Sequence, residues 1–250
     1  MRPYSSGVLS FIVPAFNEEL ELPATIAAIR DAAQDRPASA EPTAGRRYEI
    51  IVVDDASTDA TAHVAREACA QVVAINRRQI AAARNAGARA ARGDVLFFVD
   101  ADTRIRHEHV AGALESLRDG YAGGSARVIV DGTIPLWGRV FVKTFCAVYF
   151  TVNLGAGAFL FTTRGNFERI GGFNEELFVG EEVYFSLAVR KLGRFKILRE
   201  PIVTSGRKLR MYSAGKVLGN MLSVICGGVR VAQSRDKLDL WYEGKRETRT

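Results

Sequence analysis

The feature that most constrains this chain is a buried strand that ends in two carboxylates. Residues 95–99 form an unbroken run of Val, Leu and Phe, which is typical of a strand covered on both faces. Asp100 and Asp102 follow it directly. In an open α/β sheet, ligands bind just outside the carboxyl ends of the strands. We therefore expect these carboxylates at a binding crevice, where a cation compensates their charge.

The cation best suited to such a pair is a divalent metal. Hard carboxylate oxygens favour Mg²⁺ or Mn²⁺, which can bind a substrate's phosphates at the same time. Asp102 and Asp100 are therefore candidate metal ligands. The alternative is that one of them caps the next helix near Arg106. The Asp-x-Asp pattern by itself does not decide between these two interpretations.

Two upstream segments repeat the same pattern and strengthen the metal interpretation. Residues 49–53 are largely β-branched and end in Asp54 and Asp55. Residues 8–13 predict a third strand, followed by the polar residues 17–19. Three strand-to-helix junctions with polar residues at the carboxyl end are difficult to explain by helix capping alone. They predict a single crevice shared by three parallel strands.

The polar residues after the strands also predict where helices begin. Ser57 and Thr58 are candidate N-caps of a helix over about residues 59–70, and Asn17 is a candidate cap of an earlier helix. The apolar face of that earlier helix recurs at helical spacing and consists of Leu22, Ile26 and Ile29.

The motifs occur in a fixed order that resembles a known family. They lie at residues 13–19, 52–59, 83–87, 100–102, 171–175 and 180–182. The ordered set resembles family 2 glycosyltransferases of the GT-A type over about residues 8–205. The resemblance implies a Rossmann-like α/β/α sandwich with a mostly parallel central sheet and a C-terminal helical tail. It also implies a nucleotide-diphosphate sugar donor, a divalent metal (Mn²⁺ or Mg²⁺) and transfer with inversion at the anomeric carbon.

The resemblance also implies which residues bind the donor. The base and ribose pocket would be lined by Pro14, Phe16, Glu18 and Asp55. Other donor contacts would come from Arg84, Asp100, Arg127 and Arg207. Arg84 would assist the diphosphate, unless it is a solvated helix arginine. Arg207 belongs to residues 205–210, which resemble a loop that closes over the donor. Asp54 and Asn85 are interpreted as structural supports.

A second carboxylate site is expected on the acceptor side. An inverting transfer to a hydroxyl requires a general base. Glu181 and Glu182 follow Gly180 at the start of a predicted helix. The family normally carries Glu-Asp here, with the Asp as base, so Glu182 is the first candidate and Glu181 the second. Simple helix capping is the alternative interpretation of both.

Length and composition predict one domain. A chain of 250 residues, 48% hydrophobic, can bury a complete core. Within this single domain, residues 1–102 would form the nucleotide-binding half and residues 103–205 the acceptor half. Residues 206–250 would form a lid and a helical tail that ends in charged residues.

The charge distribution favours anionic partners. The net charge is +6, and basic residues crowd residues 190–210. No motif with interleaved aromatic residues supports nucleic acid as a partner. A lipid-linked acceptor and a soluble acceptor both remain open. The basic face is either simply solvated or makes a peripheral membrane contact, and residues 217–229 fit either a packed or an interfacial helix.

Other features bear on location. Residues 144–163 are uncharged and long enough to span a membrane, but Gly155 and Gly157 predict a break before a strand over residues 158–162. No signal peptide is visible, and the three cysteines, which lack metal-binding spacing, are expected to be reduced core thiols. These features favour a cytoplasmic protein, with the inner face of the membrane as the place of any peripheral contact. The oligomeric state is not determined.

Two rival functions come from other classes. A nucleotidyltransferase typically has a Gly-rich loop bearing Arg or Lys after the first strand, where residues 14–19 here read Pro-Ala-Phe-Asn-Glu-Glu. A non-catalytic nucleotide-sugar binding module is favoured only by Glu182 in place of the family's Asp. The preferred prediction remains a sugar transferase.

Overall fold

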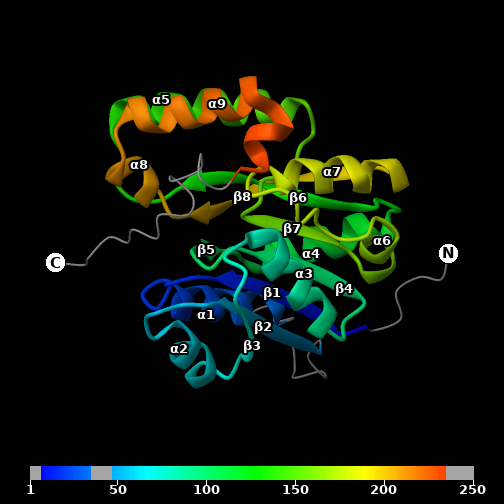
Figure 1. Cartoon of the computed structure of the whole chain (residues 1–250). Helices are drawn as coiled ribbons and strands as arrows, with labels where there is room; N and C mark the ends of the chain where they lie inside the picture. The colour runs from blue at the N-terminus through cyan, green and yellow to red at the C-terminus, as the bar shows by residue number, and fades with distance from the viewer. Residues whose placement is uncertain (1–6, 35–46, 235–250) are drawn as a thin grey trace.

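The computed structural model describes residues 7–34 and 47–234. Over these residues, one sheet runs through the molecule in the strand order β3-β2-β1-β4-β7-β6-β8-β5 (Figure 1). The strands are β1 (Leu9–Ala15), β2 (Tyr48–Asp55), β3 (Gln71–Ile75), β4 (Val95–Val99), β5 (Thr103–Arg104), β6 (Gly123–Val130), β7 (Phe159–Thr163) and β8 (Phe195–Thr204).

The sheet is parallel in its first half and mixed in its second. β1 pairs in parallel with both β2 and β4, and β3 pairs in parallel with β2. β7 then lies antiparallel between β4 and β6, while β8 is parallel to β6 and antiparallel to β5. The predicted α/β architecture is confirmed. The carboxyl ends of β1, β2 and β4 meet at one edge, as three parallel strands must.

Helices cover both faces of the sheet. The helices are α1 (Leu22–Ala33), α2 (Thr61–Glu67), α3 (Ile80–Ala90), α4 (His107–Arg118), α5 (Leu136–Thr151), α6 (Arg164–Arg169), α7 (Glu181–Leu192), α8 (Arg207–Met211) and α9 (Ala214–Ala232). Alternate residues of a strand point to opposite faces. Phe11 and Phe97 therefore pack with α1, α2 and α4, while Ile12 and Phe98 pack with α3, α6 and α7.

Two predicted helix caps are wrong. The first helix begins at Leu22 rather than next to Asn17, although its predicted apolar face is fully buried. The second begins at Thr61 and ends at Glu67, so Ser57 and Thr58 do not cap it. The Ser57 hydroxyl instead accepts a hydrogen bond from the Asn17 backbone N–H at 3.0 Å. These polar residues tie the β1 and β2 loops together, an arrangement that local capping rules do not predict.

The uncharged segment over residues 144–163 divides as predicted. α5 ends at Thr151 and β7 begins at Phe159. Within the described ranges, no helix is both long and apolar enough to cross a membrane. Residues 217–229 belong to α9, which lies alongside α5 at the top of the molecule (Figure 1). The two helices share a small apolar cluster that includes Phe141 and Val217.

Two further predictions concern residues outside the main core. Cys69 is exposed, so the prediction of a core thiol is wrong there, while Cys146 is half-buried. The side chain of Cys226 lies outside what the structure describes. Cys69 follows α2 in a turn with a positive φ of 48°, and such turns lie at protein surfaces. The predicted charged end of the tail, residues 235–250, lies outside the described residues.

Candidate active site

A pocket of about 180 Å³ opens at the carboxyl ends of β1, β2 and β4. Seven of the residues predicted to bind donor or metal line it, from four separate segments of the chain: Pro14, Phe16, Glu18, Asp55, Asp100, Asp102 and Arg207. The opposite wall comes from the start of α3 and the loop before it. The sequence-predicted crevice therefore exists as one site.

The second strand supplies a carboxylate that its neighbouring loop holds rigidly. Asp55 accepts hydrogen bonds from the backbone N–H groups of Arg77, Arg78 and Gln79, at 2.7, 2.8 and 2.7 Å. Asp54 accepts one from the Ser57 backbone N–H at 3.2 Å, in line with the structural role predicted for it. Because backbone donors hold these carboxylates, this side of the pocket is formed before any ligand arrives.

Two pocket residues were missed by the sequence analysis. The Arg78 guanidinium lies 3.3 Å from the centre of the Phe16 ring, in a cation–π contact at the pocket wall. The Gln79 amide reaches the backbone carbonyls of Glu175 and Leu177, the latter at 3.1 Å. Both residues could have been predicted, because they follow strand β3 at the same edge of the sheet where the other predicted site residues lie.

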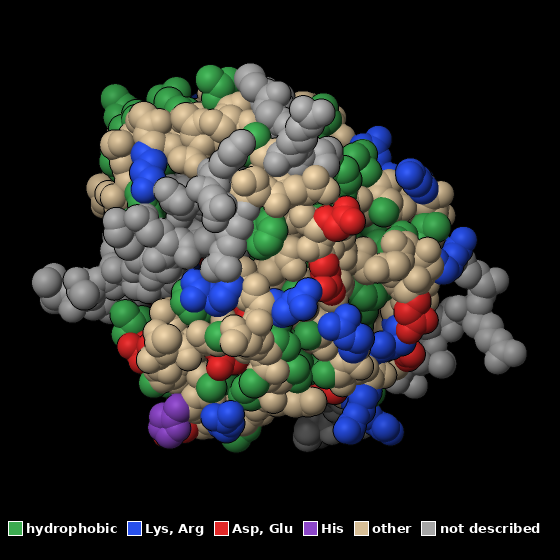
Figure 2. Space-filling view, in the orientation of Figure 1, with side chains coloured by type: hydrophobic (Ala, Val, Ile, Leu, Met, Phe, Trp, Pro, Cys, Tyr) green, Lys and Arg blue, Asp and Glu red, His purple; other side chains and the backbone are tan. Residues whose placement is uncertain are grey.

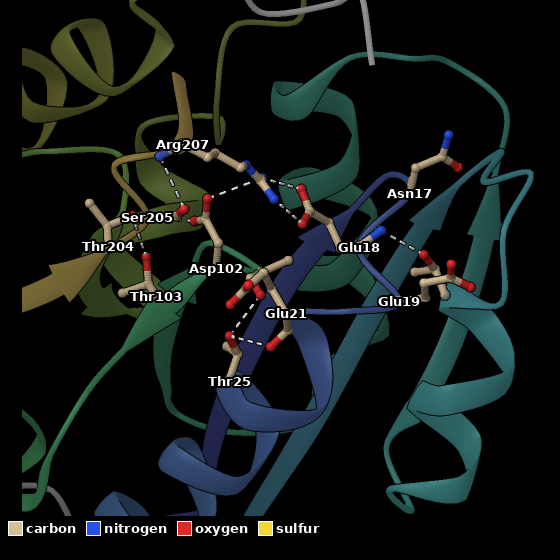
Figure 3. A network of polar contacts seen from close by, with 12 residues as sticks. Asn17, Glu18, Glu19, Glu21, Thr25, Asp102, Thr103, Thr204, Ser205 and Arg207 are labelled. Atoms are coloured by element: carbon tan, nitrogen blue, oxygen red, sulfur yellow. Dashed lines mark hydrogen bonds and ion pairs between the residues drawn. The ribbon is translucent and has the colours of Figure 1, made fainter. Parts of the chain in front are cut away.

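Arg207 closes one side of the pocket through ion pairs with two predicted ligand residues (Figure 3). Its guanidinium contacts both Glu18 carboxylate oxygens, at 2.5 and 2.7 Å, and the Asp102 carboxylate at 3.1 Å. Burial alone would lower the pKa of Arg207, but the two carboxylates outweigh it and raise that pKa. Thr204 donates a further hydrogen bond to Asp102 at 3.3 Å.

The chemistry of this site suits a divalent cation that is bound by protein carboxylates on one side and by a substrate on the other. In the described parts of the chain, no group of three or more His, Cys, Asp or Glu residues could hold a metal by itself. Asp100 and Asp102 nevertheless present two carboxylates at the pocket wall, and a guanidinium cation already rests against Asp102. These residues fit a metal that takes its remaining oxygen ligands from a diphosphate and water.

Arg84 lies beneath the pocket and does not line it. Its side chain is 1% exposed, so the alternative of a solvated helix arginine is wrong. It donates to Glu181 at 2.6 Å, to Asp100 at 3.0 Å and to the Gly157 carbonyl at 2.9 Å. Burial alone would lower the pKa of Arg84, but the neighbouring carboxylates, Asp100 first, raise it. Arg84 therefore joins Asp100, at the pocket wall, to Glu181, at the start of α7.

The two candidate bases have different surroundings. Gly180, with a positive φ of 77°, makes the turn that starts α7 at Glu181. Glu181 is buried and paired with Arg84, whereas Glu182 is half-buried. Burial, and then the neighbouring Glu181, raise the pKa of Glu182 to about 8. Burial also raises the pKa of Asp100 to about 6, although Arg84 opposes the shift.

Two other predicted residues lie away from the pocket lining. Arg127 is exposed on β6, where the pairing with β8 shifts register between Ala126 and Val128. Asn85 follows Arg84 on α3, and its amide bonds both the N–H and the carbonyl of Phe173, each at 2.9 Å. Asn85 therefore fixes a loop, consistent with its predicted structural role.

Solved structures share this fold. A mannosyltransferase from Pyrobaculum calidifontis, in complex with GDP-Man and Mn²⁺, matches with a TM-score of 0.68 and 20% identity, covering 97% of this chain and 70% of that one. Staphylococcus aureus TarS 1–349, in complex with UDP-GlcNAc, matches with a TM-score of 0.60 and 18% identity, covering 94% of this chain and 71% of that one.

Curated relatives are more similar in sequence over a shorter range. An undecaprenyl-phosphate 4-deoxy-4-formamido-L-arabinose transferase from Pseudomonas paraeruginosa is 33% identical over 128 residues, which is 48% of this chain and 35% of the relative. The corresponding transferase from Aeromonas hydrophila is 30% identical over 121 residues, 46% of this chain and 35% of the relative. The matches thus span about a third of the length of these relatives.

A family model extends the likeness to most of the chain. The model described as glycosyl transferase family 2 matches residues 10–200, a range that includes the β1, β2 and β4 junctions and the start of α7. This range also carries every ordered motif on which the sequence resemblance rests. The chain belongs to glycosyltransferase family 2.

Proposed function

We propose that this chain transfers a sugar from a nucleotide-diphosphate sugar to an acceptor oxygen, with inversion at the anomeric carbon and with help from Mn²⁺ or Mg²⁺. The observation that carries the proposal is the pocket itself. It combines two aspartates with a rigid Asp55 on the nucleotide side, and a second carboxylate pair stands at the start of α7. Family membership and solved relatives holding GDP-Man or UDP-GlcNAc support this assignment.

In the proposed reaction, an acceptor oxygen attacks the anomeric carbon as the bond to the diphosphate oxygen breaks. The nucleoside diphosphate leaves with that electron pair, and Glu182 takes the proton of a hydroxyl acceptor. Asp102 and Asp100 would hold the metal, which neutralises the charge that grows on the leaving diphosphate. Phe16, Asp55 and neighbouring residues would bind the base and ribose.

We assign Glu182, rather than Glu181, as the proton acceptor. Glu181 is already engaged by the buried Arg84 guanidinium, which donates a hydrogen bond to it at 2.6 Å. Glu182 has a raised pKa of about 8, close to the value at which a general base works best near neutral pH. The two adjacent glutamates thus have environments suited to different roles.

The acceptor we propose is lipid-linked. The relatives named above are undecaprenyl-phosphate transferases, and the described surface carries exposed apolar side chains on α5 and α9: Leu136, Val140, Leu218 and Leu222. Hydrophobic atoms gather at this end of the molecule (Figure 2). Arg127 and the basic residues near Arg207 would meet the acceptor phosphate. The protein would then be cytoplasmic, with these helices touching the inner face of the membrane.

A direct test combines donor binding with transfer. The purified protein is incubated with Mn²⁺ and either GDP-mannose or UDP-GlcNAc, and thermal shift identifies which donor binds; a ligand at 100 times its Kd stabilises by about 2.7 kcal/mol. The same mixtures then receive undecaprenyl phosphate, and mass spectrometry detects the glycolipid. Binding without any product, with lipid and soluble acceptors alike, would favour a non-catalytic binding module and contradict the proposal.

A further inference from the structure

Three residues of helix α3 or its N-cap connect the donor pocket to the segment over residues 173–181, which leads into α7. Gln79 holds the carbonyls of Glu175 and Leu177, and Asn85 holds both backbone groups of Phe173. Arg84 lies between them in the sequence and holds Glu181 itself. The whole segment before α7 is thus attached to a single helix, whose amino end forms one wall of the pocket.

Arg84 is the member of this set that also reaches the metal side. One guanidinium nitrogen donates to Glu181 at 2.6 Å, and the other donates to Asp100 at 3.0 Å. A planar guanidinium keeps its donors at fixed separations, whereas a lysine ammonium is a point charge on a flexible stem. Because the Arg84 side chain is 1% exposed, it cannot move out to solvent and let the two carboxylates separate freely.

We propose that Arg84 is a positioning residue that couples the donor edge to the acceptor helix, by holding Asp100 and Glu181 in one rigid arrangement and so fixing where Glu182 stands. The inference rests on the proposed function. Arg84 itself touches neither donor nor acceptor, since it does not line the pocket. Donor binding at Asp100 would thereby further restrain the first turn of α7, which carries Glu182.

The kinetic test uses Arg84→Gln and Arg84→Lys in the transfer assay with a hydroxyl acceptor, because Glu182 acts as a base only when the acceptor oxygen carries a proton. We expect Arg84→Gln to lower kcat by roughly 10²-fold, the loss that follows a small misplacement of a reacting group. The donor KM should change by less than about threefold, because no donor contact is removed. Arg84→Lys should recover part of the rate. An unchanged kcat, or a donor KM that rises as much as kcat falls, would overturn the proposal.

A matched control lies at the other end of the same helix. Arg164 donates to the carbonyls of Ala88, Ala91 and Gly93, so it also anchors α3, but far from the pocket. Arg164→Gln should lower thermal stability without lowering kcat. If Arg84→Gln does not fold because its carboxylates lose their partner, the double variant Arg84→Gln/Glu181→Gln removes both charges. A folded double variant with the parental kcat would equally overturn the inference.

A second readout does not depend on transfer. Hydrogen exchange of amides 180–184 is measured with Mn²⁺ and UDP or GDP, whichever binds. The parent protein should show slower exchange there on binding, and the Arg84→Gln variant or the double variant should not. Slower exchange in a parent protein that transfers no sugar would support the coupling while contradicting the proposed function. Unchanged exchange in the parent protein, whether or not sugar is transferred, would overturn the coupling.

Discussion

The two halves of this molecule hold their functional charges in different ways. On the nucleotide side, Asp55 is held by three backbone N–H groups about 22 to 24 residues away, in the next loop of the same parallel unit. Across the pocket, Arg207 and Glu18 are 189 residues apart, and Arg84 and Glu181 are 97 apart. Asp55 is thus held by a neighbouring strand junction, whereas Arg207 and Glu181 are held by ion pairs to distant segments.

This difference has a physical consequence. Backbone donors cannot rotate away from Asp55, so the nucleotide side is preorganised and should tolerate changes across the pocket. The ion pairs that involve Arg207 join side chains that can separate, so the other side can respond to a bound metal or donor. Substitutions on the two sides of the pocket should therefore have effects of different size.

The largest effect is expected from Glu182→Gln. With a hydroxyl acceptor, transfer should fall by about 10²- to 10⁴-fold because the side chain can no longer accept a proton. Donor binding should persist, since the nucleotide side is built independently. Single-turnover transfer at saturating donor measures this effect, and the exposed Glu168→Gln serves as control. With a phosphate acceptor, whose oxygen is already ionised, the loss should be much smaller, so the variant also identifies the acceptor class.

Asp102→Asn should lower transfer by roughly 10²-fold, because a strong stabiliser of the leaving diphosphate is weakened while the shape is kept. The Mn²⁺ concentration needed for half-maximal rate should rise. Asp94→Asn, at the opposite end of the same strand, is the control and should leave both quantities unchanged. A parental rate that is also insensitive to EDTA would contradict the metal-assisted reaction.

The raised pKa of Glu182 predicts a pH dependence on the acceptor side. The base acts when deprotonated, so kcat/KM with a hydroxyl acceptor should rise about tenfold per pH unit up to about pH 8. Glu182→Gln should remove this limb. Because the folded state keeps a proton that the unfolded chain releases near pH 4.5, the same group should lower the unfolding free energy as pH rises from 4.5 to 8. A pH-independent rate over this range would show that another group is the base.

Arg207→Gln tests the long-range ion pairs. We expect the unfolding free energy to fall by about 1–3 kcal/mol, because the buried Glu18 carboxylate loses its charged partner. Arg106, which is 60% exposed and also pairs with two carboxylates, is the matched comparison. Arg106→Gln should change stability by less than about 0.5 kcal/mol. Urea unfolding of both variants measures this difference. Equal losses of unfolding free energy would mean that burial of the Arg207–Glu18 pair does not contribute to stability.

The smallest effect is expected at the membrane surface. Leu222, which is 61% exposed on α9, should contribute to binding of anionic vesicles, and Leu222→Ser should reduce co-sedimentation about threefold. Leu187 is 43% exposed on α7, outside the α5–α9 surface, so Leu187→Ser is the control and should leave co-sedimentation unchanged. Binding should weaken with salt. Equal sedimentation of Leu222→Ser and the parent protein would remove α9 from the proposed contact.

Most of the nucleotide side was predictable because it is local. Apolar strands followed by residues 17–19, by Asp54 and Asp55, and by Asp100 and Asp102 mark three junctions, and parallel pairing must bring them together. The start of α7 at Glu181 could also be predicted from the preceding Gly180. Helix caps were predicted less well, because Asn17 and its neighbours bond across two loops instead of capping their own helices.

The α/β architecture, the family and most of the residues that line the pocket could be predicted from the amino-acid sequence, because those features depend on strand periodicity and on motifs in a fixed order. The folded structure was needed to identify the partners of the charged side chains. It placed Arg84 as a buried bridge between Asp100 and Glu181, and it set Arg207 against Glu18 and Asp102. Such pairs depend on the packing of distant segments, and nothing in the local sequence around either partner specifies the other.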